Sequence, residues 1–270
     1  MAIPLIVTGA AGRMGKRLIA LALEEAPRRF TLVGALDRAD CPVIGSDAGL
    51  VAGVGAAGVK ITAALEASVT SGVVVDFSAP AATRALLAEC GRRGLSIVIG
   101  TTGLTAEDQR LIYEAARRIA ILQATNTSLG VNVLLGLVAA AARQLGDGYD
   151  IEIVEAHHNL KKDAPSGTAL SLAESIAQAT GRATEQDLVY GRVGKEALRK
   201  KGTIGMHAVR MGDVIGEHTV YFAAGGGGER VELRHVATSR DTFAKGALRA
   251  AEFIAGKPPG RYAMKDVLGL

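Results

Sequence analysis

The stretch IPLIVTGAAGRMG, residues 3–15, decides the fold of this chain. Its first residues are almost all apolar, which is typical of a strand buried on both faces in a parallel sheet. Glycines follow at positions 9, 12 and 15, and beyond the loop Met14, Leu18, Ile19 and Ala22 recur at helical spacing. The sequence therefore predicts a strand, a tight glycine loop and a helix in immediate succession.

This order of elements is the one that a dinucleotide-binding site requires. Glycine allows a tight turn, close approach of the backbone to a pyrophosphate, and close packing of the helix on the strand. The phosphates would lie at the helix N-terminus, where N–H groups and the helix dipole favour anions. The spacing is GxxGxxG rather than the strict GxGxxG, and it does not fit a phosphate-binding P-loop either. The loop alone is therefore a weak signal.

Two charged residues strengthen the prediction of a cofactor site. Asp37 ends a second predicted strand, where a carboxylate would bind the ribose hydroxyls of NAD. Arg38 follows it and could pair with the extra phosphate of NADP. The alternative is an ordinary glycine turn beside a solvated ion pair. We predict a cofactor site that accepts either NADH or NADPH.

Strand-like and helix-like stretches alternate through the first half of the chain. After the first helix, which is expected to stop at Pro27, strands are predicted at 30–37, 73–78, 96–102 and 119–125, with helices at 81–92 and 106–118. This alternation predicts an α/β fold with a doubly wound parallel sheet of Rossmann type.

The pattern changes after Asn126. A long apolar helix, an alternating strand and a second helix lead into several short alternating runs, two of which are joined by Gly225–Gly228 as a hairpin connection. We predict a second, α+β domain on a mostly antiparallel sheet with one face covered. The expected divisions are a dinucleotide-binding domain at 1–127, a substrate-binding and oligomerisation domain at 128–238, and a C-terminal segment at 239–270 that returns to the first domain.

Composition favours a cytoplasmic, soluble protein with a small anionic ligand. The 270 residues are 49% hydrophobic, and a chain of this length is expected to form two domains. The net charge of +4 comes without an arginine-rich arm, and aromatic residues make up only 4%, so no nucleic-acid partner is expected. No signal peptide and no apolar run long enough for a membrane span are expected. Cys41 and Cys90 have neither the spacing nor the context of a disulfide.

The stretch EAHHNLKKDAPSGTA, residues 155–169, gathers chemically active side chains. His157 lies at the end of a predicted strand and is a natural general acid, and Lys161 in the next loop could supply a positive charge or a proton. Ser166, Gly167 and Thr168 are expected in the first turn of a helix, where N–H groups and a hydroxyl could hold a carboxylate.

Each of these residues also has an ordinary structural explanation. A histidine at a strand end is often structural, paired lysines in a loop are usually solvated, and Ser-x-Thr at a helix start often only caps it. Their clustering in a chain with a dinucleotide loop favours a catalytic site. A metal site is not expected, because adjacent histidines on a strand point to opposite sides and no cysteine completes a ligand set.

Several segments together resemble the 4-hydroxy-tetrahydrodipicolinate (dihydrodipicolinate) reductase family. They are GAAGRMG, VIGTTG, NTSLGVN, EAHHNLKKDAPSGTA, GTIG…VRMGDVIGEHTVYF and SRDTFAKGALRAAEFIAGKPPGRYAMKDVLGL. The resemblance covers nearly the whole chain in order, and EAHH…K.DAPSGTA is its most specific part. It implies reduction of the cyclic product of pyruvate and aspartate semialdehyde to tetrahydrodipicolinate by NADH or NADPH, in lysine and diaminopimelate synthesis.

The same resemblance implies roles for individual residues. His157 would be the catalytic proton donor and acceptor, and Lys161 the second proton donor. The substrate carboxylates would be bound by His158, Lys161, Ser166, Gly167 and Thr168. The cofactor would contact Gly9, Ala10, Ala11, Gly12, Arg13, Met14, Asp37, Arg38, Gly100, Thr101, Thr102, Ala124, Thr125, Asn126 and Thr127.

Two other functions remain open from the sequence. The first is another two-domain NAD(P) dehydrogenase of a small carboxylate, although a semialdehyde dehydrogenase would need a nucleophilic cysteine in a suitable motif. The second is a nucleotide-sensing regulator, which would be expected to lose the His/Lys set. The second sheet is expected to have a face that one helix layer does not cover. We therefore expect a homo-oligomer formed through that sheet, and the resemblance implies a homotetramer.

Overall fold

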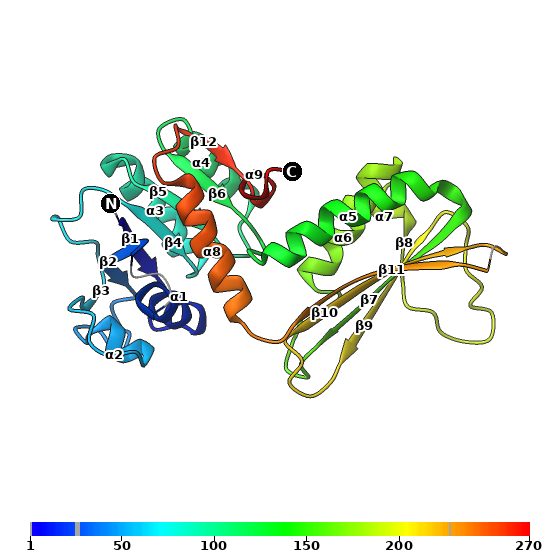
Figure 1. Ribbon diagram of the computed structural model, residues 1–270, viewed down its shortest axis with the longest axis horizontal. Coiled ribbons are helices and arrows are strands. Elements are labelled where there is room, and N and C mark those ends of the chain that lie inside the picture. The colour runs from blue at the N-terminus through cyan, green and yellow to red at the C-terminus, as the bar shows by residue number, and fades with distance from the viewer. Residues whose placement is uncertain (1, 25–27, 227) are drawn as a thin grey trace. The chain divides into compact units, whose positions relative to one another are not determined.

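The computed structural model describes residues 2–24, 28–226 and 228–270, so the expected helix stop at Pro27 and Gly227 of the expected hairpin lie outside the described residues. The chain forms two compact units. Unit 1 comprises Met1–Leu129 and Arg240–Leu270, and unit 2 comprises Gly130–Ser239. Figure 1 shows both units, and in each of them helices pack on a sheet.

Unit 1 is built on a seven-stranded sheet with the order β12-β6-β5-β4-β1-β2-β3, in which the strand pairings are parallel. The strands are β1 (Ile3–Thr8), β2 (Phe30–Leu36), β3 (Ile61–Thr62), β4 (Val73–Asp76), β5 (Ser96–Ile99), β6 (Ala120–Gln123) and β12 (Gly260–Tyr262). The short strands β3 and β12 at the two edges were not predicted from the sequence.

Helices cover both faces of this sheet. One face packs against α1 (Arg13–Glu24) and α8 (Asp241–Ile254), and the other against α3 (Pro80–Arg93) and α4 (Ala106–Ala115). Strand β1 is buried on both faces of the sheet: Leu5 and Val7 belong to the first core and Ile6 to the second. This explains why its sequence is almost entirely apolar. The predicted doubly wound parallel sheet is confirmed. Two short helices complete the unit, α2 (Ala48–Ala52) and α9 (Met264–Leu268).

The strand order reverses direction at β1, which lies between β2 and β4. Ligands of open parallel sheets bind beside such a reversal, at the carboxyl ends of the strands. The strand register aligns these ends, because Thr8 lies beside Asp76, and Asp76 beside Ile99. The loops that follow β1, β4 and β5 therefore meet at one edge of the sheet.

Unit 2 contains a five-stranded sheet with the order β11-β10-β7-β9-β8. Its strands are β7 (Tyr149–His157), β8 (Leu188–Tyr190), β9 (Ile204–Arg210), β10 (Gly216–Ala224) and β11 (Arg230–Ala237). The predicted α+β domain is confirmed, and its sheet is mixed. Strand β10 pairs antiparallel with β7 and β11, whereas β9 pairs parallel with β7 and β8. The crossover through α6 (Gly167–Thr180) and α7 (Thr184–Asp187) explains the parallel pairs.

Helices α5 (Leu129–Leu145) and α6 cover one face of the second sheet (Figure 1). Alternate residues of β7, Ile151 and Ile153, are buried in that core. The same alternation places Glu155 and His157, at the end of the strand, on the helix-covered side. On the opposite face, no helix packs among the residues that the structure describes.

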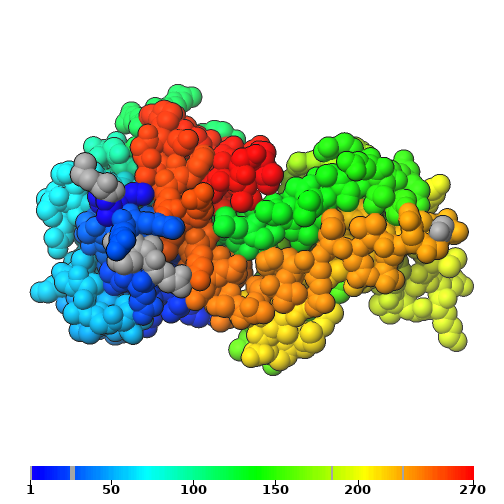
Figure 2. Space-filling model, in the orientation of Figure 1, coloured from blue at the N-terminus to red at the C-terminus, as the bar shows by residue number. Residues whose placement is uncertain are grey.

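Helix α5 differs from the expectation that no apolar segment is long enough for a membrane span. With the turn that follows it, Leu129–Gly148, it has the length and composition to cross a bilayer. Leu134, Val138 and Ala142 of this helix pack in the core of unit 2. Figure 2 shows its other side, in green, at the surface.

Candidate active site

The glycine loop after β1 is packed so tightly that two positions require glycine. A Cβ atom on Gly9, whose φ is +69°, would lie 2.4 Å from the carbonyl oxygen of Phe77. A Cβ atom on Gly15 would lie 2.1 Å from the carbonyl oxygen of Gly9. The loop therefore brings the backbone after β1 against the start of α1, where the helix dipole favours an anion.

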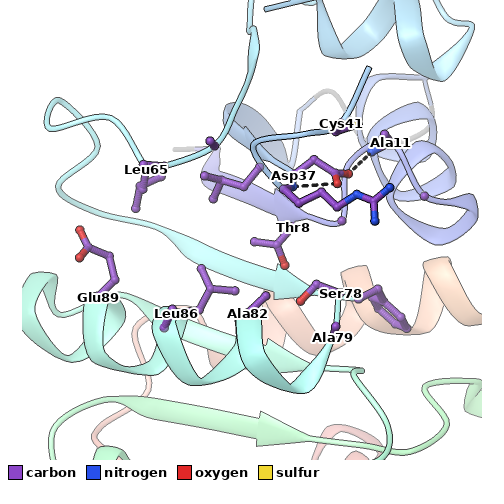
Figure 3. Close-up of a pocket in the computed structure, with 18 of the residues that line it drawn as sticks. Thr8, Ala11, Asp37, Cys41, Leu65, Ser78, Ala79, Ala82, Leu86 and Glu89 are labelled. Atoms are coloured by element: carbon purple, nitrogen blue, oxygen red, sulfur yellow. Dashed lines mark hydrogen bonds between the residues drawn. The ribbon is translucent and has the colours of Figure 1, made fainter. Parts of the chain in front are cut away.

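A cavity of about 870 Å³ opens at the carboxyl ends of β1, β2 and β4. Five predicted cofactor residues line it: Gly9, Ala11, Gly12, Asp37 and Arg38. The carboxylate of Asp37 accepts hydrogen bonds from the backbone N–H groups of Ala11, at 2.8 Å, and Arg38, at 2.9 Å (Figure 3). The carboxylate is thus fixed in the cavity wall beside the glycine loop. The Arg38 side chain is exposed and forms an ion pair with Asp40 at 3.1 Å.

The cavity also has walls that the sequence motifs did not reveal. Ala82, Leu86 and Glu89 lie along α3 on one side of it, and Leu65 lies across from them (Figure 3). None of these residues belongs to a recognisable motif. The sequence could have indicated these residues only through their position, because α3 directly follows β4, the strand beside the topological reversal.

Asp76, at the end of β4, forms a buried hydrogen-bonding centre beneath the cavity. Its carboxylate accepts from the hydroxyls of Thr8 at 2.6 Å, Ser78 at 2.5 Å, Thr83 at 2.6 Å and Thr101 at 3.0 Å. These hydroxyls come from the ends of β1, β4 and β5 and from α3, so one carboxylate ties together the loops that form the site. The side chain of Thr101, predicted to contact the cofactor, is used in this network.

The remaining predicted cofactor residues follow the next strands along the same edge. Gly100, Thr101 and Thr102 follow β5, and the ring of Phe77 packs so closely on Gly100 that a Cβ there would lie 2.4 Å from it. Ala124, Thr125, Asn126 and Thr127 follow β6. The Thr127 side chain is buried and donates a hydrogen bond to the Phe243 carbonyl in α8 at 2.7 Å. Ala10 is buried, Met14 is half-buried and Arg13 is exposed at the start of α1.

In unit 2, His157 is held by a buried carboxylate. Glu155 is fully buried, and one of its oxygens lies 2.5 Å from Nδ1 of His157. Arg210 in β9, which is the strand partner of His157, donates to both oxygens of Glu155, at 2.8 and 2.9 Å. The backbone N–H of Ser166 donates to the same carboxylate at 3.0 Å. Glu155 thus receives hydrogen bonds from three different segments of the chain.

These contacts decide the protonation of the pair. Burial raises the pKa of Glu155, but the hydrogen bonds from Arg210, His157 and Ser166 outweigh it, and the net pKa lies below its ordinary value. Burial lowers the pKa of His157 more than the bond to Glu155 raises it, so the net pKa of His157 also lies below its ordinary value. At neutral pH the resting pair is a carboxylate and a neutral imidazole, whose proton lies on Nδ1. Nε2 is then the atom available for proton transfer.

Gly216, at the start of β10, leaves space beside that atom. A Cβ atom at this position would lie 3.1 Å from Nε2 of His157. The same strand carries His218, whose ring packs edge-on against His157 with a centroid distance of 5.2 Å. Burial, followed by repulsion from His157 when that ring is protonated, lowers the pKa of His218 to about 4. His218 is therefore neutral at physiological pH, and sequence reasoning had not selected it.

Lys161 lies in the loop after His157 and its ammonium group contacts both oxygens of Asp163, at 2.8 and 2.9 Å. The side chain of Asp163 is 61% exposed, so this carboxylate, unlike Glu155, is open to solvent. The hydrogen bond from Lys161 lowers the pKa of Asp163. His158, predicted to bind substrate, is half-buried directly after β7.

The helix start differs from the prediction in one respect. Ser166 is the N-cap of α6 and does not lie in its first turn, and Gly167 is the first helical residue. The Ser166 hydroxyl accepts from the N–H of Ala169 at 3.2 Å and contacts Nε2 of His218 at 3.1 Å. Both polar groups of this buried serine are thus engaged within unit 2. Gly167 and Thr168 form the first turn, where the helix dipole favours a carboxylate.

Glu155, Arg210 and His218 complete the cluster that sequence reasoning had only partly found. Glu155 did leave a signal, because IEIVEAHH alternates and a charged residue on the buried side of a strand needs a partner. Its partner on β9 could not be identified before the register was known. No group of three or more potential metal ligands occurs among the described residues.

Family models identify both parts of the chain. Residues 3–127 match "Dihydrodipicolinate reductase, N-terminus", and residues 130–268 match "Dihydrodipicolinate reductase, C-terminus". The chain belongs to the dihydrodipicolinate reductase family. The resemblance seen in the sequence is thereby confirmed.

Relatives in this reductase family match the chain over its full length. A 4-hydroxy-tetrahydrodipicolinate reductase of Syntrophotalea carbinolica is 49% identical over 269 residues, 99% of each chain. Another of Geobacter sulfurreducens is 48% identical over 265 residues, 98% of each chain. A dipicolinate-bound dihydrodipicolinate reductase from Paenisporosarcina sp. TG-14 shares the fold with a TM-score of 0.74 at 23% identity, covering 97% of this chain and 98% of that one.

Proposed function

We propose that this protein reduces 4-hydroxy-tetrahydrodipicolinate to tetrahydrodipicolinate with a nicotinamide cofactor, in lysine and diaminopimelate synthesis. The observation that carries the proposal is that a buried Glu155 holds His157 and the N-cap of α6, with Lys161 in the loop between them, in a chain with full-length relatives of that name. Replacing a hydroxyl by hydrogen releases water and consumes one proton for each hydride. The reaction thus needs proton carriers beside an anion-binding surface.

The residues of unit 2 fit those needs. His157 offers Nε2 for proton transfer while Glu155 holds Nδ1. Lys161 supplies an ammonium group that can bind a substrate carboxylate and donate a proton. Gly167 and Thr168, at the start of α6, supply N–H groups and a dipole for a second carboxylate, and His158 directly follows His157 at the end of β7. We place the substrate against these residues and the N-cap Ser166.

The residues of unit 1 fit a dinucleotide. The closely packed glycines leave the backbone accessible to a pyrophosphate, and the cavity beside Asp37 has room for an adenosine moiety. When bound, the nicotinamide supplies a hydride to the substrate. Asp37 is positioned to accept hydrogen bonds from ribose hydroxyls, and the exposed Arg38 can leave Asp40 to pair with a 2′-phosphate. We propose that both NADH and NADPH are used.

We further propose that the protein works as a cytoplasmic homotetramer assembled through unit 2. The face of its sheet opposite α5 and α6 carries Val154, Val209, Tyr221 and Val236, as strand alternation and register require. Val209 and Val236 are 39% and 43% exposed. A second copy packed on this face would bury them.

A coupled assay tests the activity. Purified protein would receive the product that a synthase makes from pyruvate and aspartate semialdehyde, and oxidation of NADH and of NADPH would be followed at about 340 nm. Oxidation that depends on the synthase product supports the proposal and ranks the two cofactors. Cofactor binding by calorimetry without oxidation would contradict it and would favour another carboxylate dehydrogenase or a nucleotide sensor.

A further inference from the structure

We propose, on the basis of the function proposed above, that Glu155 and Arg210 are positioning residues that hold both proton carriers of the reaction. Glu155 would set the tautomer and orientation of His157. Arg210 would hold Glu155 in place and anchor the loop that carries Lys161. Neither residue is assigned to bind substrate.

The hydrogen bonds of Glu155 leave its carboxylate no freedom. Its two oxygens accept four hydrogen bonds, two from Arg210, one from His157 and one from the Ser166 backbone. Ser166 is the N-cap of α6, so the carboxylate connects β7, β9 and the helix start. An ionised carboxylate in a fully buried position persists only when paired in this way.

The pairing fixes which nitrogen of His157 carries the proton. A carboxylate whose oxygen lies 2.5 Å from Nδ1 requires a hydrogen on that atom. Nε2 of the neutral ring is then the proton acceptor, and it faces the space left by Gly216. With the other tautomer, Nδ1 would direct a lone pair at an anion, so the proposed pairing excludes it.

Arg210 also reaches the second proton carrier. The guanidinium group that binds Glu155 donates to the carbonyl oxygen of Asp163 at 2.7 Å. Asp163 in turn holds the Lys161 ammonium group through its side chain. The chain just beyond Arg210 adds two backbone bonds, from Met211 N–H to the His157 carbonyl at 2.9 Å and from Asn159 N–H to the Gly212 carbonyl at 3.2 Å. The segment 210–212 therefore anchors the loop from His157 to Asp163.

The test compares Glu155→Gln, Arg210→Met and the double variant in steady-state kinetics. Since wrong tautomers and lost general acids cost roughly 10²- to 10⁴-fold in rate, each single variant should lose about 10²-fold or more in kcat. KM should change less than about threefold in Glu155→Gln, which leaves the Lys161 loop in place, whereas Arg210→Met should also raise KM because Arg210 anchors that loop. The double variant should lose about as much as either single one, because the two residues act as a unit.

Glu152→Gln is the matched control. Glu152 lies on the opposite face of the same strand and is also bound by arginine and histidine, namely Arg192, Arg199 and His207. The control should keep kcat within about twofold, since its partners are not assigned to the reaction. An equal loss in Glu152→Gln would mean that any disturbance of the strand stops the enzyme, and would overturn the proposal. The double variant removes the buried charge of Glu155 together with that of its half-buried partner Arg210, which limits misfolding from an unpaired charge.

Nitrogen NMR of histidine-labelled protein gives a readout independent of turnover. The chain has five histidines, and a His157→Asn variant identifies the signals of His157. The wild type should show the Nδ1–H tautomer at neutral pH, and Glu155→Gln should lose that preference. The pH profile of kcat should also shift toward lower pH in Glu155→Gln, because the carboxylate favours the imidazolium. The other ionisable groups around His157, which are Lys161, Arg210 and His218, remain in that variant.

Three results would overturn the proposal. These are an Nε2–H tautomer in the wild type, a rise in KM without loss of kcat, or multiplicative losses in the double variant. A failure of the proposed function looks different. In that case the wild type would not oxidise the cofactor with the synthase product, while the tautomer of His157 and its dependence on Glu155 would still be measurable.

Discussion

At the residue scale, the two proposed proton carriers are held by carboxylates in contrasting surroundings. Glu155 is fully buried and bound from several sides, whereas Asp163 is largely exposed and bound chiefly by Lys161. An exposed ion pair contributes little to stability and exchanges its partner readily. The imidazole is therefore held in one orientation, while the ammonium group is able to move toward an arriving carboxylate.

His157→Ala and Lys161→Ala should each lower kcat by about 10²- to 10⁴-fold, the usual contribution of a general acid or base. Cofactor affinity, measured by calorimetry, should remain nearly unchanged, because both residues belong to unit 2. Lys162→Ala is the matched control, since Lys162 is exposed next to Lys161. Near wild-type turnover in either variant would remove that residue from the mechanism.

Arg38→Ala tests the cofactor preference. The loss of a guanidinium group that can pair with the 2′-phosphate should raise KM for NADPH by about tenfold, and KM for NADH by much less, since a charged hydrogen bond contributes roughly 1.5–3 kcal/mol. Steady-state kinetics with both cofactors provides the measurement, and Arg110→Ala, an exposed arginine of α4, serves as the control. Equal losses with the two cofactors would contradict the phosphate role.

At the element scale, strand β7 carries one acid cluster on each face, a buried one at Glu155 and a partly buried one at Glu152. Glu155 faces the helices, and Glu152 on the other face is bound by Arg192, Arg199 and His207. Burial raises the pKa of Glu152, but the hydrogen bonds from Arg192 and His207 lower it by more, so the net pKa is about 2. Both carboxylates of the strand therefore stabilise the fold only while they are ionised.

The lowered pKa of Glu152 predicts a loss of folding stability in acid. Glu152 stabilises the fold fully above its ordinary pKa of 4.5, and the effect is lost as pH falls toward the folded value of about 2. A shift of this size corresponds to on the order of 3 kcal/mol. Urea unfolding should show that Glu152→Gln lowers stability strongly at pH 7 and much less at pH 3. Exposed Glu114→Gln is the control, and an equal effect at both pH values would contradict the assignment.

The tight packing of the glycine loop predicts that a side chain at Gly15 lowers both stability and cofactor affinity. Gly15→Ala places a Cβ against the Gly9 carbonyl, and overpacking of this kind costs about 1–3 kcal/mol. The variant should also bind NADH more weakly, because the loop must move. Gly91→Ala in α3 is the control, since a Cβ there meets no atom within 4 Å and should stabilise the helix by about 0.5–1 kcal/mol. Thermal melts and calorimetry would compare them, and unchanged binding in Gly15→Ala would contradict the role of the loop.

The elements differ in how much the sequence revealed about them. The central strands of unit 1 were predictable because they are largely buried on both faces and therefore mostly apolar, as β1 shows. Strand β3 was not, since it has only two residues and no pattern. In the candidate site, His157 and Lys161 belonged to a motif, whereas Arg210 acts through strand register, which pairs it with His157 from 53 positions away. Long-range pairing of this kind leaves no periodic signal in a single sequence.

At the scale of the whole molecule, the sheet of unit 2 has one face that no described helix covers. If copies pack on this face, the protein should sediment as four chains of 27.8 kDa each. Val236→Lys, which places a charge on that face, should dissociate the assembly, because an unpaired buried charge costs several kcal/mol. Leu50→Lys, at an exposed leucine of unit 1, is the control. A wild-type monomer in sedimentation would contradict the tetramer.

The return of the chain to unit 1 has a consequence for how the protein is made. Residues 240–270 supply α8, whose Ala244, Ala247 and Ala251 are buried in the first core, and the edge strand β12. During translation these elements are synthesised only after all of unit 2. While unit 2 can begin to fold on the emerging chain, the part of the first sheet that α8 covers stays exposed until residues 241–254 have been synthesised. Unit 1 is thus begun before unit 2 and completed after it.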